Sequence, residues 1–183
     1  MTYEMTVAGV TRQLPLRPIS DTLMIGAFVI FGDVELTCAC ARDLLKIARG
    51  FDYMVAPEAK AIPLVHEMAR QGGRNDYFLV RKAPKLYMDG VFEAVDRSIT
   101  TEGEQKLYMD GADAAKIRGK RILILDDVIS TGGSLAAVEN LVEQAGGMVA
   151  GRMAILAEGD AAKRDDILFL ERLPLFSADG TPL

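Results

Sequence analysis

The sequence predicts an α/β fold built on a doubly wound, mostly parallel sheet. Two observations predict this class: short apolar segments alternate with longer segments of helical periodicity, and the apolar segments are continuous, as in strands buried on both faces. Alternating elements of this kind form a parallel sheet between two layers of helices. The expected strands are 52–56, 76–80, 122–125, 148–156 and 167–170, and the expected helices are 35–48, 60–70 and 135–144.

The alternation of strands and helices is less regular in the N-terminal segment and in the middle of the chain. Residues 1–20 alternate like a hairpin around Ala8 and Gly9 and form an expected N-terminal arm, while 23–31 is apolar enough for either a strand or a helix. A polar excursion at 83–115 interrupts the sheet pattern, and such excursions are usually functional. The hexapeptide Lys-Leu-Tyr-Met-Asp-Gly occurs in it at 85–90 and again at 106–111, which predicts two similar strands of a projecting hairpin or hood.

Composition limits the class of protein. The chain has 183 residues and a net charge of −5, which predicts a single domain over 1–183 and weighs against nucleic acid or an anionic membrane as a partner. Cys38 and Cys40 are too few for a disulfide framework or a zinc site, so we expect reduced thiols in a cytoplasmic protein. The N-terminus lacks the pattern of a signal peptide, and no apolar run approaches the length of a membrane span.

The segment 121–134 carries the strongest chemical pattern in the chain. An apolar strand at 122–125 is followed by two carboxylates, Asp126 and Asp127, and then by a loop of hydroxyls and glycines that leads into an apolar-periodic helix. Such a loop at a helix N-terminus binds anions, because its N–H groups converge and the helix dipole favours negative charge. The two carboxylates suit sugar hydroxyls or a hydrated Mg²⁺. We therefore expect a sugar phosphate here.

This order of residues resembles the motif with which type I phosphoribosyltransferases bind 5-phosphoribosyl-1-pyrophosphate (PRPP). The resemblance implies that Asp126 and Asp127 hold the ribose, place Mg²⁺ through water and, in the case of Asp127, are catalytic. It also implies that the 5-phosphate binds the loop formed by Ser130, Thr131, Gly132, Gly133 and Ser134.

Two further segments resemble the pyrophosphate sites of purine members of this family. The stretch Glu58, Ala59, Lys60 and Ala61 stands where the family has Glu-x-Arg-Gly, and Lys60 keeps the positive charge without the bidentate fork of arginine. Residues 79–86 resemble the Arg-Lys-x-x-Lys-Leu segment of adenine enzymes. The cations implied there are Arg81, Lys82 and Lys85, which would stabilise the departing pyrophosphate.

The resemblance is less exact in the segments that would contact the purine base. Either Glu102 or Glu104 matches the catalytic glutamate that the family carries in its hood, and a carboxylate there would exchange a proton with the base. Arg17, in a stretch similar to the Val-Phe-Arg of adenine enzymes, and Ile129 are the expected base contacts.

Taken together, the resemblance implies a purine phosphoribosyltransferase, nearest to the adenine enzymes, that uses PRPP, a purine base and Mg²⁺ and forms a homodimer. Specificity for hypoxanthine, guanine or xanthine remains an alternative. A regulator that binds PRPP without turnover is a second alternative, although such regulators carry a DNA-binding module for which this acidic chain has no room.

Overall fold

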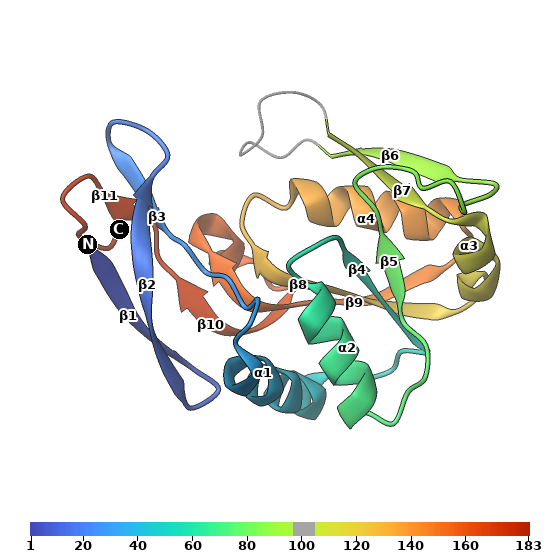
Figure 1. Cartoon of the computed structure of the whole chain (residues 1–183), viewed down its shortest axis with the longest axis horizontal. Helices are drawn as coiled ribbons and strands as arrows, with labels where there is room; N and C mark the ends of the chain where they lie inside the picture. Colours follow the sequence, from blue (N-terminus) through green and yellow to red (C-terminus); the bar gives the residue numbers. More distant parts are fainter. Residues whose placement is uncertain (97–104) are drawn as a thin grey trace.

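The structure, a computed structural model, describes residues 1–96 and 105–183, and it contains the predicted parallel sheet (Figure 1). Five strands lie in the order β10-β9-β8-β4-β5, and every neighbouring pair is parallel. Their bounds are Tyr53–Pro57 for β4, Phe78–Val80 for β5, Arg121–Ile129 for β8, Met148–Glu158 for β9 and Leu168–Leu173 for β10. The α/β, doubly wound class is therefore confirmed.

Helices cover both faces of this sheet. They are α1 (Val34–Ile47) and α2 (Ile62–Gln71) on one face, and α3 (Gly111–Ile117) and α4 (Gly133–Gln144) on the other (Figure 1). The central strand β8 shows why its sequence is apolar throughout: Leu123 and Leu125 are buried in the cluster that contains α1 and α2, whereas Ile122 and Ile124 are buried in the cluster that contains α3 and α4.

The N-terminal arm forms the expected hairpin and belongs to a second sheet. Strands β1 (Thr2–Val7) and β2 (Val10–Pro18) pair antiparallel around Ala8 and Gly9, which have positive φ angles of 52° and 79°. The segment that the sequence left open contains strand β3 (Leu23–Gly26). With the short C-terminal strand β11 (Phe176–Ser177) these strands form an antiparallel sheet in the order β1-β2-β3-β11. The C-terminal strand β11 thus lies beside β3, in the same sheet as the N-terminal hairpin.

The prediction for the repeated hexapeptide is wrong for its first copy. The hairpin in this region pairs β6 (Phe92–Asp96) with β7 (Gln105–Met109), so the second copy supplies β7 while residues 85–90 form turns before β6. Tertiary contacts decide between the two, because Leu107 is 1% exposed in the core beside α4, whereas Leu86 is fully exposed after Pro84. The polar excursion also contains α3, which the sequence did not predict.

Other element boundaries moved by a few residues. The second helix begins at Ile62 rather than at residue 60, with Pro63 in its first turn, and β10 continues to Leu173. A short 3₁₀ helix, η1 (Gly159–Lys163), follows β9. None of the helices in the described residues is both long and apolar enough to cross a bilayer.

Candidate active site

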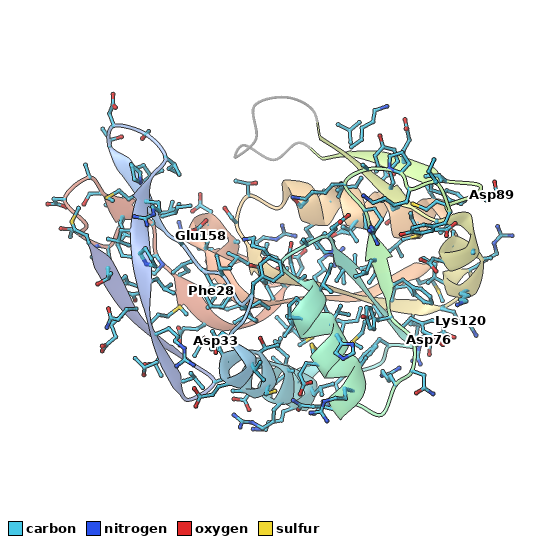
Figure 2. The ribbon with its side chains drawn as sticks, in the orientation of Figure 1. Phe28, Asp33, Asp76, Asp89, Lys120 and Glu158 are labelled. Atoms are coloured by element: carbon cyan, nitrogen blue, oxygen red, sulfur yellow. The ribbon has the colours of Figure 1, made fainter. Side chains whose placement is uncertain are left out.

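A cavity of about 580 Å³ opens at the carboxyl ends of the central parallel strands, where α/β sheets bind their ligands. Its walls come from the segment after β3, the loop after β4, the end of β8 with the start of α4, and the ends of β9 and β10. Figure 2 labels two of the lining residues, Phe28 and Glu158. The lining consists of residues 25–29, 57–60 and 126–135 together with Lys82, Leu107, Glu158 and Leu173.

The predicted acid pair lies near the carboxyl end of strand β8 and lines this cavity. Asp127 is only 2% exposed, and the Nζ atom of Lys60 lies 3.1 Å from its Oδ2 atom. That approach does not have hydrogen-bond geometry, so Oδ2 has no hydrogen-bond partner among the described residues. Asp126 accepts a hydrogen bond from the N–H of Asp127, at 2.8 Å. A buried acceptor left open in this way is available to a ligand hydroxyl or to a metal-bound water.

Burial and mutual repulsion act on the acid pair. Burial raises the pKa of Asp126 well above its ordinary value, the adjacent Asp127 raises it further, and Lys60 opposes both effects. Burial and the neighbouring acid thus make it costly to ionise both carboxyl groups beside a single cation. The pair is therefore suited to a ligand that brings hydroxyl donors or positive charge.

The predicted phosphate loop joins β8 to α4. Gly132 is the N-cap of α4 and has a φ of +83°, a conformation that favours glycine, and no side chain caps the helix. The first N–H groups of a helix have no partner within it, and an N-terminus without a side-chain cap has the chemistry to bind an anion. Ser130 also lies close enough to Glu158 to lower the pKa of its carboxyl group, a neighbour that the sequence did not predict.

The loop after β4 lies beside the acid pair and is linked to β5. Glu58 accepts hydrogen bonds from Nε of Arg81 at 3.0 Å and from the N–H of Lys82 at 3.2 Å. Lys60 and Lys82 line the cavity, as do Glu58 and Ala59, and Ala61 is the N-cap of α2 without a side-chain hydrogen bond. The structure therefore brings the predicted pyrophosphate residues 58–61 and Lys82 next to the predicted ribose residues.

Other predicted residues stand apart from the cavity lining. Arg81 is tied to Glu58, and Lys85 lies in the turns after it, with its N–H directed at the sulfur of Met88. Arg17 is exposed on β2, opposite the lining residue Ile25 of β3, whereas Ile129 is buried and lines the cavity. Both candidate catalytic glutamates, Glu102 and Glu104, fall outside the described residues.

Sequence reasoning missed Glu158, which ends β9 and lines the cavity. Its position carries a signal of the kind that identified the acid pair, because an acid follows a buried apolar strand at residues 153–157. Burial raises the pKa of Glu158, while Ser130 and Lys60 lower it.

With this geometry in view, comparisons with known proteins identify the family. A model of the phosphoribosyl transferase domain matches residues 38–174, and the chain therefore belongs to this family. An adenine phosphoribosyltransferase of Thermotoga neapolitana is 37% identical over 110 residues, which are 60% of this chain and 61% of that protein. The chain thus matches about three fifths of the length of that curated relative.

Further comparisons point to the same fold and to two purine classes. A hypoxanthine/guanine phosphoribosyltransferase of Methanococcus voltae is 26% identical over 149 residues, covering 81% of this chain and 73% of that protein. The crystal structure of an adenine phosphoribosyltransferase from Thermoanaerobacter pseudethanolicus has a TM-score of 0.66 and 26% identity, covering 78% of this chain and 84% of that one. A yeast enzyme complexed with adenine, 24% identical with a TM-score of 0.67, shares the fold and covers 86% of this chain and 92% of its own.

Proposed function

We propose that this protein is an adenine phosphoribosyltransferase, which transfers the 5-phosphoribosyl group of PRPP to a ring nitrogen of adenine and releases pyrophosphate. One observation carries the proposal: an acid pair with a buried Asp127, an uncapped helix N-terminus and two lysines surround a single cavity. This lining offers groups that can bind the ribose, the 5-phosphate and the pyrophosphate of PRPP, and a purine base.

Different residues of the cavity bind different parts of PRPP and the base. The 5-phosphate binds the N–H groups of the loop at 130–134, and the ribose hydroxyls bind Asp126 and Asp127. Lys60 and Lys82 neutralise the charge that develops on pyrophosphate as its bond to C1′ breaks. Ile129 packs against the base, and Glu102 or Glu104 exchanges its proton.

A magnesium ion fits this site when the substrate brings most of its ligands. No group of three or more metal-binding side chains occurs in residues 1–96 and 105–183. The open Oδ2 atom of Asp127 and the neighbouring Asp126 instead suit a hydrated Mg²⁺, which binds proteins through one or two carboxylates plus phosphates and water. When bound, the ion would neutralise part of the charge of pyrophosphate.

Hypoxanthine or guanine is the second candidate acceptor, since the similar Methanococcus voltae protein is named for both bases. The proposal includes a homodimer, which light scattering on the purified protein would test. It also includes a cytoplasmic location, which suits the free thiols of Cys38 and Cys40.

The test is product formation with PRPP, Mg²⁺ and, separately, adenine, hypoxanthine, guanine, xanthine, uracil and orotate, followed by chromatography. We expect AMP and an equal amount of pyrophosphate from adenine, and Asp127→Asn should remove most of this turnover without unfolding the protein. Binding of PRPP without product from any base would contradict the proposal and favour a sensor.

A further inference from the structure

The chemical character of the cavity lining changes from one end to the other along the edge of the sheet. Its cations come from the loop after β4 and the end of β5, its acid pair and phosphate loop from β8, and an apolar wall from β3, Ile129 and Leu173 on the other side. In a displacement at C1′ the incoming nitrogen approaches opposite the departing pyrophosphate. The purine of the proposed reaction therefore belongs against the apolar wall, beyond β8 and away from Lys60 and Lys82.

Glu158 stands in this apolar wall. It ends β9, and its partner in the sheet register is Leu173 of β10, which also lines the cavity. Figure 2 labels Glu158 together with Phe28, a 4% exposed lining residue from the segment after β3. The carboxyl group of Glu158 thus belongs to the same part of the cavity lining as Leu173, on the side where the base would bind.

The carboxyl group of Glu158 has no cation paired with it, unlike those of Glu58 and Asp127. Glu58 is bonded to Arg81, and Asp127 has Lys60 at 3.1 Å. The hydroxyl of Ser130 lowers the pKa of Glu158, and no ion pair joins Glu158 to a cation in the described part of the chain. Burial is the main cause of its raised pKa, and a hydrogen-bond donor from a ligand would offset that cost.

We infer that Glu158 accepts a hydrogen bond from the exocyclic amino group of the base and thereby selects a 6-aminopurine over a 6-oxopurine. The inference rests on the proposed function and assigns its base specificity to one side chain. An ionised carboxylate only accepts hydrogen bonds. It attracts the N–H donors of a 6-amino group, and it repels the oxygen of a 6-oxo group, which is also an acceptor.

Glu158→Gln tests this assignment, because glutamine has the same shape but adds an N–H donor for a 6-oxo oxygen. We expect the ratio of kcat/KM for adenine to that for hypoxanthine to fall at least about tenfold, the size of one charged hydrogen bond. The KM for PRPP is measured in the same assays, because Glu158 lies near Ser130 of the phosphate loop and a purely structural role would raise that KM. Glu158→Asp, which retains the charge, should lower turnover yet preserve the preference for adenine.

Glu143→Gln is the matched control, since it makes the same change on the exposed face of α4 and should leave the ratio unaltered. Calorimetric titration of adenine and hypoxanthine in the presence of ribose 5-phosphate gives a second readout that does not need turnover. An unchanged ratio in Glu158→Gln would overturn the inference while leaving the proposed function intact. An equal loss for both bases with a higher KM for PRPP would also overturn it, by assigning Glu158 a structural role. A wild-type protein that uses no purine at all would instead contradict the proposed function.

Discussion

Of the four α-helices in the described residues, two begin with a side-chain cap and two begin without one. At the start of α1, Asp33 accepts the N–H of Leu36, and at the start of α3, Asp110 accepts the N–H of Ala112 (Figure 2 labels Asp33). Helices α2 and α4 begin at Ala61 and Gly132, and neither has a side-chain cap. The two uncapped helices are those that begin beside the cavity.

A capping carboxylate satisfies the first N–H groups of a helix and cancels part of its positive dipole. A helix that is to bind an anionic ligand must do without that carboxylate and accept lower intrinsic stability. We therefore expect the starts of α1 and α3 to serve the stability of the fold, and we propose that α2 and α4 begin at the binding sites of the pyrophosphate and the 5-phosphate. Four substitutions test this division.

The largest effect is expected when α4 is given a cap of the kind that α1 has. Gly132→Asp places a carboxylate where the phosphate should bind, and the affinity for ribose 5-phosphate should fall about a hundredfold or more, because charge-assisted hydrogen bonds are lost. Isothermal titration calorimetry measures this change.

Gly132→Ala is the control for the backbone at this position. A Cβ atom there would lie 2.9 Å from Nη1 of Arg164, and the left-handed φ adds a cost of about 1–2 kcal/mol. Alanine should thus weaken binding far less than aspartate. Equal losses in the two variants would attribute the effect to strain and not to charge.

A smaller kinetic effect is expected at the start of α2. Lys60→Gln removes the cation 3.1 Å from Asp127, and kcat/KM for PRPP should fall about tenfold through weaker stabilisation of pyrophosphate. Lys120→Gln, at the other end of β8 (Figure 2), makes the same charge change and should have no such effect in initial-rate assays. If both variants behaved alike, net charge rather than position would explain the loss.

At α1 the expected effect is on stability. Asp33→Ala removes a helix cap and the ion pair with Arg12, whose Nε lies 2.7 Å from Oδ2, and should lower the free energy of unfolding by about 1–2 kcal/mol. The KM for PRPP should not change. Urea denaturation at pH 7 and initial rates measured in parallel would separate the two quantities.

The same residue predicts a pH dependence. The hydrogen bond from Arg12, followed by that from the N–H of Leu36, lowers the pKa of Asp33, so the ionised form is bound more tightly in the folded state. Its contribution is complete above the ordinary aspartate pKa of about 3.9 and is lost as the pH falls through the lower folded value. The stability difference between wild type and Asp33→Asn should be constant from about pH 5 to 8 and shrink below about pH 4. A difference that grew on acidification would contradict this sign.

The smallest effect is expected at α3. Asp110 accepts the N–H groups of Ala112 and Asp89, each at 3.3 Å, so both hydrogen bonds are long. Asp110→Ala should lower the free energy of unfolding by about 0.5–1 kcal/mol and leave catalysis unaltered. A loss of turnover at unchanged stability would show that this end of the molecule takes part in function.

Much of the site could be predicted from the sequence because its main parts are contiguous. The strand, Asp126, Asp127 and the glycine-containing loop follow one another, and local rules of strand, turn and helix then fix their arrangement. Arg164 could not be assigned in this way, since its relevance arises from the approach of η1 to the phosphate loop. Glu158 follows a buried strand as the acid pair does, but its place in the cavity depends on the position of β9 in the sheet.

The repeated hexapeptide shows the limit of local reasoning in the fold. Identical residues form a turn at 85–90 and a strand continuing into a helix cap at 106–111. The second copy has a sheet partner in β6, a bridge between Tyr108 and Arg81, and a buried Leu107, and the first copy has an exposed Leu86. Tertiary context overrides the intrinsic preference of such a short segment.

The central claim is that the uncapped N-terminus of α4 holds the 5-phosphate of PRPP. Phosphorus NMR of ribose 5-phosphate titrated with the protein tests it most directly, because the phosphate itself is observed. We expect the resonance to shift and broaden with the wild type and with Lys120→Gln, and to remain at its free position with Gly132→Asp. A resonance unaffected by the wild-type protein, or shifted equally by Gly132→Asp, would contradict the claim.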